Sequence, residues 1–454
     1  RAASLSVLVV ELEPTVGGTS ASGDTGVTRY PWGAHYTAAP NVEARAPLKL
    51  LSDIGAVTGW DAAGRPVFDP KLLCHAPAER LFYEGAWHEG LTPDGLSAAE
   101  IEEIERFDDV TNELVELVGA DGRPAFTIPL DLSSRDPEIL ALDDITMADW
   151  LDQRGFTSAF VRWSVRYACL DDFGGVPEDV SAWAGLHYFA ARKLRSAELE
   201  GSHFLVWPEG NGRLVRALAE LGAPRVLTRS LARSVQATRD GVEVEVVDAA
   251  ALVVRRVAAR AAVVAAPAFV TRRIVAACPE LPTRSASPWV VANLHVDWPF
   301  DPDRPWDSVL YGAEGLGYVD ARHQMTDLRD GTVLTYYRAY GEPDVRAARA
   351  ALVDRPWESH VADALADLAP AHPGLAEEVS RVDVMIWGHG MPRPRPGFLG
   401  PRPFEPVVQL GPRVAWAHVD QGGMALFEEA LTRGVRAAEA LGPCLGRPLG
   451  ETWT

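Results

Sequence analysis

The chain has 454 residues, of which 47% are hydrophobic and 23% are charged, a composition that is ordinary for a globular protein. Its length favours two domains over one, because single hydrophobic cores stop growing at about 250–300 residues. The net charge of −20 argues against nucleic acid and anionic membranes as partners, because both would repel the chain.

The cysteines and the apolar runs further limit the class of protein to which the chain can belong. The four cysteines are far apart in the sequence and form no CxxC pair, so neither a metal site nor a disulfide framework is predicted. No run approaches the ~20 apolar residues of a membrane-spanning helix, so no integral membrane segment is predicted. The sequence leaves the oligomeric state open, with a homodimer as one option, and leaves the compartment open between the cytoplasm and export.

The chain begins with a strand-like segment, Leu5 to Leu12, whose Val and Leu content is typical of a buried parallel strand. In a nucleotide-binding fold, an acid at the end of such a strand accepts hydrogen bonds from the adenosine ribose, and Glu11 has that position. Gly17 and Gly18 then allow a ligand to approach the backbone, although a tight turn would use them equally well. The segment 17–40 is rich in Gly, Ser, Thr and Pro and is expected to be a loop.

Helices are expected in the first half of the chain and again in the second. Residues 98–118 place apolar side chains at helical spacing, and 181–193 is expected to form another helix, preceded by the DDFGG loop. A third helical region is expected at 344–368, with an interruption at Pro356, because proline lacks the backbone N–H that continues a helix.

A different pattern lies between these helical regions. Over residues 225–266 the apolar period becomes two, and Asp240-Gly241 between two such runs is a strong hairpin signal. We expect a small antiparallel unit that returns to a parallel sheet at 261–266. The C-terminal segment 413–441 predicts a strand, a glycine-containing loop and a helix whose N-terminus offers unpaired N–H groups to a ligand.

Four stretches together resemble one family. They are VLVVELEPTVGGTSAS, YPWGAHYTAAP, VVAAP and the C-terminal AWAHVD followed by FEEALTRGVRAAEAL. They are similar to segments of the flavin-containing amine oxidoreductase superfamily, which includes monoamine oxidases, protoporphyrinogen oxidases and phytoene desaturases. The resemblance covers both ends and the middle of the chain.

The resemblance implies an α/β fold with FAD as cofactor. A FAD/NAD(P)-binding Rossmann-like domain would be built from the discontinuous segments 1–45, 205–285 and 381–454. An α+β substrate-binding domain would be inserted between them as residues 46–204 and 286–380.

The resemblance also implies which residues contact FAD. Glu11 would hold the ribose, the 17–19 segment would lie along the pyrophosphate, and the 32–35 segment would approach the isoalloxazine. The backbone of Ala232 would meet the adenine, Asp420 would lie near the ribityl phosphate, and the Phe427 amide would reach a flavin carbonyl. The implied cofactor-binding set is Glu11, Gly17, Gly18, Thr19, Trp32, Gly33, Ala34, His35, Ala232, Ala266, Pro267, Asp420 and Phe427.

Four departures from the family pattern stand out. The GxGxxG unit of the family would lie before residue 1, so the opening strand corresponds to the second strand of the nucleotide-binding unit. Thr19 replaces an arginine, and His418 replaces a glycine near the flavin. Many amine oxidases carry a lysine that reaches flavin N5 through water, but Ala292 or Asn293 has that place here.

The substrate side is expected in IWGHGMPRPRPGF, residues 386–398, which we interpret as an extended loop because of its prolines and arginines. Trp387 would supply an aromatic wall, and His389 a group with a pKa near ~6.5. His323 and His418 complete the candidate catalytic set. For each histidine, a purely structural role is the alternative.

Two further polar features are interpreted as structural. His187 lies within a predicted helix and is expected at the edge of the core. Asp171 and Asp172 could be a paired carboxylate, but a helix-capping loop is the preferred interpretation.

These observations predict an FAD-dependent oxidoreductase of the amine-oxidase type, acting on a small molecule. A hydride would pass to flavin N5 from a carbon beside nitrogen or from another activated C–H. The alternatives are a desaturase or isomerase of an apolar substrate, and a flavin-fold protein that no longer binds the cofactor.

Overall fold

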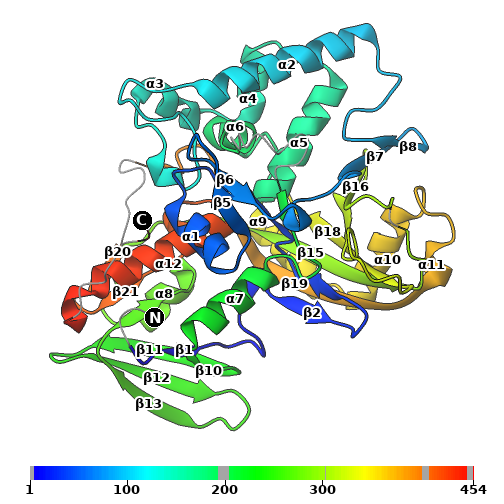
Figure 1. The fold of residues 1–454 in the computed structure, drawn as a ribbon. Helices are drawn as coiled ribbons and strands as arrows, with labels where there is room; N and C mark the ends of the chain where they lie inside the picture. The colour runs from blue at the N-terminus through cyan, green and yellow to red at the C-terminus, as the bar shows by residue number, and fades with distance from the viewer. Residues whose placement is uncertain (1–4, 193–203, 302, 401–407, 447–452, 454) are drawn as a thin grey trace.

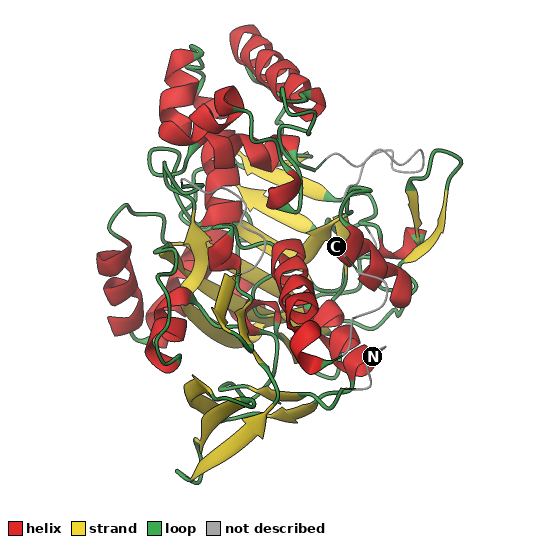
Figure 2. Cartoon of the chain, turned by 90° about the vertical axis from the view of Figure 1, so that its left-hand side faces the viewer, coloured by secondary structure: helices red, strands yellow, loops and turns green. Residues whose placement is uncertain are grey.

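The structure of the protein is a computed structural model that describes residues 5–192, 204–301, 303–400, 408–446 and 453. A seven-stranded sheet lies beside a bundle of helices, and a small antiparallel unit projects from the opposite end of the molecule (Figure 1). The view in Figure 2 shows the same arrangement, with this small unit again at one end of the molecule. No helix in the described ranges is long and apolar enough to cross a membrane.

The opening strand is present but short. β1 (Leu8–Val10) pairs in parallel with β10 (Arg225–Leu227), and the Glu11 N–H continues the pairing by donating to the Leu227 carbonyl at 2.8 Å. The prediction of a parallel strand is therefore confirmed for its central residues. The residues before Leu5 lie outside the described chain.

The segment expected as a loop contains regular structure. Its backbone forms the short strands β2 (Ser22–Asp24), β3 (Arg29–Pro31) and β4 (Tyr36–Ala38). β2 and β3 form a hairpin, and β4 pairs with β9 (Phe204–Val206). The turn between β3 and β4 is thereby held in place by pairing on both sides.

The antiparallel unit follows the predicted pattern. It consists of β11 (Ser230–Ala237), β12 (Val242–Asp248) and β13 (Val254–Ala259). The Thr238 N–H donates to the Gly241 carbonyl at 2.9 Å, which closes the turn predicted at Asp240-Gly241. The hairpin prediction is confirmed.

The chain then enters a second parallel pair, as predicted. β14 (Ala262–Val264) pairs in parallel with β21 (Val414–Trp416), whose other edge carries the antiparallel β20 (Val408–Gly411). Helix α8 (Ala268–Ile274) follows β14, and α12 (Phe427–Leu441) follows β21. The strand expected at 261–266 and the strand, loop and helix expected over 413–441 are thus confirmed.

The largest sheet has seven strands in the order β19-β15-β18-β17-β16-β7-β8. The strands are β7 (Glu79–Tyr83), β8 (Ala86–Glu89), β15 (Ser285–Val296), β16 (Asp307–Leu310), β17 (Gly317–Asp320), β18 (Thr332–Ala339) and β19 (Val379–Arg393). Because β19 pairs with β15, residues 381–393 of the proposed flavin domain share a sheet with the proposed substrate domain. We therefore place the last domain boundary after Arg393 in our proposed division.

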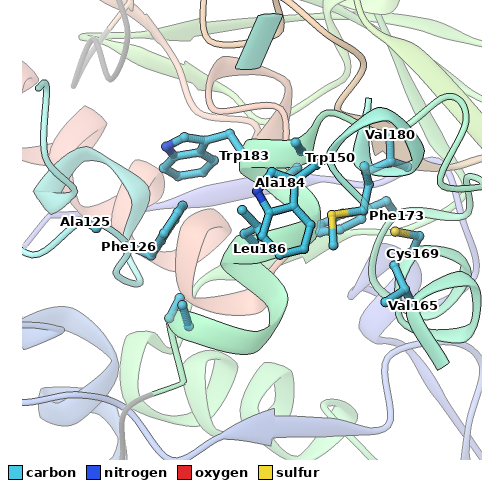
Figure 3. Packing of buried hydrophobic residues seen from close by; sticks show 14 of the residues in the cluster. Ala125, Phe126, Trp150, Val165, Cys169, Phe173, Val180, Trp183, Ala184 and Leu186 are labelled. Carbon is cyan, nitrogen blue, oxygen red and sulfur yellow. The ribbon is translucent and has the colours of Figure 1, made fainter. Parts of the chain in front are cut away.

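A helical layer lies beside this sheet and contacts β19 through α5 (Ala159–Phe173), whereas α9 (Val345–Asp354) and α10 (Trp357–Leu368) pack against β15 and β19. The helices of the layer are α2 (Ala98–Glu116), α3 (Pro137–Leu140), α4 (Met147–Gln153), α5 and α6 (Ala182–Ala190). Trp183 and Leu186 of α6 lie among Phe126, Trp150 and Phe173 (Figure 3), and most residues of α6 are buried. The helices predicted at 98–118 and 181–193 are confirmed, although Lys193 lies outside the described residues.

Pro356 divides the third predicted helical region. α9 (Val345–Asp354) ends before it, and α10 (Trp357–Leu368) uses Pro356 as its N-cap. The predicted interruption is confirmed. The remaining helices and strands are α1 (Arg45–Asp53), β5 (Val57–Trp60), β6 (Pro66–Phe68), α7 (Gly212–Gly222) and α11 (Leu375–Glu378).

Candidate active site

A cavity of about 910 Å³ lies where the N-terminal turn, the large sheet, the helical layer and α12 meet. Its wall includes residues of the β3–β4 turn, α5, the segment after α6, β15, β18, β19 and the start of α12. Of the predicted site residues, the cavity brings together Thr19, Gly33, Ala34, His35, Trp387 and Phe427.

One side of the cavity is formed by the N-terminal turn. The Ala34 N–H donates to the Thr19 carbonyl at 2.8 Å, which brings the two backbone segments into contact. A Cβ atom on Gly33 would lie 2.5 Å from that same carbonyl oxygen. Glycine is therefore required at position 33, because any side chain would push these segments apart.

The start of α12 forms a second side. Phe427 is the first residue of this 15-residue helix, and Ala425, Leu426 and Phe427 all line the cavity. The first N–H groups of a helix have no partner within the helix and carry a partial positive charge. This wall therefore offers backbone donors to a carbonyl or another acceptor of a bound ligand.

Aromatic rings form much of the remaining wall. Trp387 donates its indole N–H to the Trp32 carbonyl at 2.7 Å, which fixes the ring against the N-terminal turn. The rings of His35 and Tyr337 lie 4.9 Å apart. Nδ1 of His35 lies 3.1 Å from the Gly33 carbonyl, and burial lowers the pKa of His35 to about 4. His35 is thus a neutral imidazole at neutral pH, with the proton on Nδ1.

Carboxyl groups also line the cavity, and two of them come from the end of α5. Asp171 and Asp172 lie in its last turn rather than in a capping loop, so our preferred interpretation of this pair was wrong. Gly174, with a φ of +60°, ends the helix instead. Asp172 is paired with Arg192, whose Nη2 lies 2.7 and 2.8 Å from the two carboxylate oxygens.

Asp171 has a different environment. The Tyr36 hydroxyl is its hydrogen-bond partner, and no ion pair joins it to a described residue. Burial, and next the neighbouring carboxylate of Asp172, raise the pKa of Asp171 to about 7. Arg192, which acts on Asp171 as well as on Asp172, opposes this rise in part, so the cavity wall holds a carboxyl group with a raised pKa.

The polar atoms of the wall allow a test of whether a flavin fits. Asn211 Oδ1, Trp289 Nε1 and Arg192 Nε are buried and have no hydrogen-bond partner in the part of the chain that is described. Leaving such groups unpaired costs about 1–3 kcal/mol each, which indicates that a polar ligand completes the site. A flavin ring carries both donors and acceptors, so it fits this mixed set together with the N-terminus of α12.

The residues predicted to contact the adenosine and pyrophosphate of FAD lie outside the cavity but near one another. Glu11 follows β1, and its carbonyl accepts the Ser230 N–H at 2.8 Å, so the strand that carries Ala232 begins beside it. Gly17 and Gly18 have φ values of +130° and +55°, which favour glycine. This grouping supports the predicted roles, which stay proposals.

The predicted residues of the C-terminal strand and loop form a network of their own. Asp420 accepts the Ala268 N–H at 2.8 Å, while the Asp420 N–H donates to Nδ1 of His418 at 3.1 Å. The Trp416 indole N–H donates to the Ala266 carbonyl at 2.8 Å, next to Pro267. Asp420 therefore joins the start of α8 to the loop before α12, and neither Asp420 nor His418 lines the cavity.

His389 is exposed and does not line the cavity; its ring lies beside that of Phe269, with centroids 4.5 Å apart and planes tilted by 31°, and its catalytic role stays a prediction. The segment 386–398 is not a loop at its start, because β19 continues to Arg393. The pairing of β19 with β15 is irregular here: Trp387 pairs with Trp289 and Met391 pairs with Ser287, so β19 has two more residues than β15 between these pairs. The extra backbone turns His389 outward while Trp387 and Met391 still line the cavity.

His323 is also placed away from the cavity. Its Nδ1 lies 3.1 Å from the Arg304 carbonyl, and its Nε2 lies 3.1 Å from the His75 carbonyl. Burial lowers the pKa of His323, and a neutral ring donates from one nitrogen only, so one of these two contacts is a hydrogen bond. The catalytic role of His323 stays a prediction. His187, in contrast, is buried as expected, with Nε2 at 3.0 Å from the Thr127 carbonyl.

The position of the family's lysine is filled differently here. Asn293 donates to the Pro31 carbonyl at 3.1 Å and accepts from the Thr335 hydroxyl at 2.7 Å, and Ala292 is fully buried. Among the described residues that line the cavity there is no lysine.

Comparison with known proteins places this geometry in context. A family model described as flavin containing amine oxidoreductase matches residues 61–442. No curated protein matches the sequence.

Several solved structures have the same fold. Cyclohexylamine oxidase from Brevibacterium oxydans IH-35A is 17% identical, with a TM-score of 0.68, and the match covers 98% of this chain and 95% of that one. Wild-type putrescine oxidase bound to putrescine is 16% identical, with a TM-score of 0.66 and coverage of 98% and 93%. A putative protoporphyrinogen oxidase from Exiguobacterium sp. 255-15 is 14% identical, with a TM-score of 0.61 and coverage of 97% and 92%.

Proposed function

The chain belongs to the flavin-containing amine oxidoreductase family, and from this premise we propose that its cavity is the site at which an amine is oxidised with FAD. The protein is an FAD-dependent oxidoreductase of the amine-oxidase type. The roles of individual residues below are part of the proposal.

One observation carries the assignment of the cavity. Three segments that are hundreds of residues apart, at Thr19–Ala34, Trp387–Met391 and Ala425–Phe427, converge on the same enclosed space. The sequence resemblance independently associated each of them with the flavin or its substrate side. Their meeting at one cavity supports its identification as the flavin and substrate site.

When bound, FAD supplies the acceptor for a hydride from the carbon beside the substrate nitrogen. The N–H groups at the start of α12 would hold a flavin carbonyl oxygen, and the buried Asn211 Oδ1 would accept a hydrogen bond from the ligand. Gly33 would let the ligand approach the N-terminal turn closely.

Aromatic side chains would orient the substrate and exclude water from it. Trp387, Trp289 and Tyr337 form apolar walls that exclude water from the reacting carbon. His35 is neutral and therefore does not repel a protonated amine as it enters. The charged groups of the wall argue against the alternative substrate, a long apolar polyene, because burying such a chain against carboxylates would be costly.

A product assay tests this function. The FAD-loaded protein is incubated with a panel of amines and an artificial electron acceptor, and aldehyde or ketone products are trapped with a hydrazine reagent. The proposal predicts carbonyl product and reduced acceptor in equal amounts with at least one amine. Reduced acceptor with an apolar polyene and no carbonyl product from any amine would contradict it.

A further inference from the structure

The face of the large sheet that lines the cavity continues beyond it. Trp289 and Val291 of β15 line the cavity. Asn293 and His295 follow on the same face, because successive side chains of a strand point to opposite faces. Asn293 pairs in register with Asp383 of β19. A polar part of the sheet therefore adjoins the cavity wall.

This polar part contacts β3, the strand that leads into the turn between β3 and β4. The Tyr30 hydroxyl donates to Oδ2 of Asp383 at 2.9 Å. Asn293 donates to the carbonyl of the next residue, Pro31, at 3.1 Å. The Trp32 carbonyl accepts an indole N–H from β19 at 2.7 Å. Three successive residues of the chain are thus each hydrogen-bonded to a side chain of β15 or β19.

The carboxylate of Asp383 is itself held in place. Nε2 of His295 lies 2.9 Å from the same Oδ2, and Nε of Arg381 donates to Oδ1 at 2.8 Å. Burial alone would raise the pKa of Asp383, but these contacts and the hydrogen bond from Tyr30 lower it below its usual value. Burial, and next Asp383, raise the pKa of Tyr30, so its hydroxyl keeps the proton that it donates. The contact is therefore a charge-assisted hydrogen bond, which is the stronger kind.

The residues tied to the sheet stand directly before the cavity wall. Gly33, Ala34 and His35 line the cavity, and on their other side the Ala34 N–H donates to the Thr19 carbonyl. A shift of residues 30–32 would therefore move this wall. Apolar side chains in place of the polar ones could pack against β3 with similar stability, since the net gain from a hydrogen bond is small. Directional hydrogen bonds instead fix one position of β3.

We propose that Asp383 is a positioning residue, which holds Tyr30 so that the turn after it has a single position against the bound flavin. The inference rests on the proposed function, because it takes the cavity as the flavin site. Asp383 is not among the described residues that line the cavity, so it acts through β3. Loss of the contact should weaken FAD binding and change the absorption of the bound flavin, which a purely structural contact would not do.

Tyr30→Phe keeps the buried ring and removes the hydroxyl that Asp383 accepts. Tyr336→Phe is the matched control. The Tyr336 hydroxyl donates to Asp367 at 2.6 Å, and its ring is 1% exposed. It lies on the face of β18 opposite to that of the cavity-lining Tyr337. Both variants lose one tyrosine–aspartate hydrogen bond, so urea should unfold both at similarly reduced concentrations.

Dilution of the FAD-loaded protein, followed by the fluorescence of released FAD, gives the dissociation constant. We expect it to rise by about three- to tenfold in Tyr30→Phe, as the loss of one hydrogen bond implies, with a shift in the visible absorption peaks of the bound flavin. Tyr336→Phe should match the unmodified protein in both readouts. Equal dissociation constants and spectra in the two variants overturn the inference, while FAD binding still supports the proposed function. An unmodified protein that holds no FAD contradicts the proposed function and the inference with it.

Two variants of Asp383 show whether Tyr30 acts through this carboxylate. Asp383→Ala removes the acceptor and should raise the FAD dissociation constant as Tyr30→Phe does, whereas Asp383→Asn keeps an acceptor and should restore most of the affinity. The double variant Tyr30→Phe/Asp383→Ala should bind FAD no more weakly than Asp383→Ala alone, because both changes break the same contact. Losses that multiply in the double variant would mean that the two residues act independently, and the inference would be wrong.

Discussion

At the residue scale, the indole N–H of Trp387 is the contact that fixes the aromatic wall of the cavity. It donates to the Trp32 carbonyl at 2.7 Å and joins β19 to the N-terminal turn. The ring is partly buried and lines the cavity. Its orientation is therefore set by a backbone acceptor rather than by packing alone, which gives substrate a wall of fixed shape.

Trp387→Phe tests this contact. The variant keeps an aromatic ring but loses the hydrogen bond, which costs about 0.5–1.5 kcal/mol and frees the ring to tilt. We expect kcat/KM for the preferred amine to fall by about tenfold while the protein keeps its flavin, as measured by steady-state kinetics and the visible spectrum. Unchanged kinetics would show that the hydrogen bond does not position the wall.

At the element scale, the N-terminal turn and β19 shape the cavity. The turn between β3 and β4 approaches the Thr19 carbonyl so closely that only glycine fits at position 33. β19 reaches the cavity with Trp387 and then carries Arg393 into the interior. Both elements place cavity residues through backbone contacts distant in sequence.

Gly33→Ala introduces a Cβ atom 2.5 Å from the Thr19 oxygen, whereas a Cβ atom on Gly59 meets nothing within 4 Å. Overpacking of this kind costs about 1–3 kcal/mol, so Gly33→Ala should unfold at lower denaturant concentration and retain less FAD. Gly59→Ala should match the unmodified protein in both measurements. Equal flavin content in the two variants would contradict the proposed role of the turn.

Arg393 holds β19 to its surroundings. Its guanidinium group donates to the Ser287 hydroxyl, to Asp179 and to the carbonyls of Gly174 and Tyr340, and its side chain is fully buried. Lysine cannot reproduce this planar set of donors, so the carbonyls would lose their partners.

Arg393→Lys is accordingly expected to lower the free energy of unfolding by about 3 kcal/mol or more. Arg395→Lys changes a more exposed arginine two residues later and should cost less than about 1 kcal/mol. Urea unfolding of the two variants gives both values. Equal stabilities would mean that the network around Arg393 contributes little.

The sequence was most informative where structure is local. Helical spacing at 98–118, the Asp240-Gly241 turn and Pro356 each predicted their element, because these signals depend on neighbouring residues. The position of His389 could not be predicted, since it depends on how β19 pairs with a strand about 100 residues earlier. Asp171 and Asp172 were noted as a possible carboxylate pair, but their place in the cavity could not be predicted, because it depends on α5 meeting Tyr36 of a strand distant in sequence.

At the scale of the whole molecule, buried histidines link folding to pH. His372 lies near Trp87, Trp298 and Tyr318, and its Nε2 accepts the Tyr318 hydroxyl at 2.9 Å. Burial, with Arg80 and Arg304 nearby, lowers the pKa of His372 to about 4. The unfolded chain takes up a proton at this histidine near pH ~6.5, whereas the folded protein does not. The folded state therefore loses stability as the pH falls from 7 toward 4.

His372→Gln should reduce this loss. Protonation of His372 in the unfolded chain alone should lower the free energy of unfolding by about 2 kcal/mol between pH 7 and pH 5. The free energy of unfolding of the variant should therefore fall by about 2 kcal/mol less than that of the unmodified protein over the same pH range. Denaturant unfolding at the two pH values measures it. The control His75→Gln changes an exposed histidine, and its loss of stability between pH 7 and pH 5 should equal that of the unmodified protein. An identical loss in both variants would refute the assignment of this pH dependence to His372.

The whole fold brings three distant segments to one cavity, and this convergence carries the account of function. Anaerobic titration of the FAD-loaded protein with each amine of the panel tests it most directly, because no assumption about the electron acceptor is needed. The account predicts, for at least one amine, complete loss of the visible absorbance of oxidised flavin at about one equivalent of amine per flavin. Bound flavin that stays oxidised in an excess of every amine would contradict it.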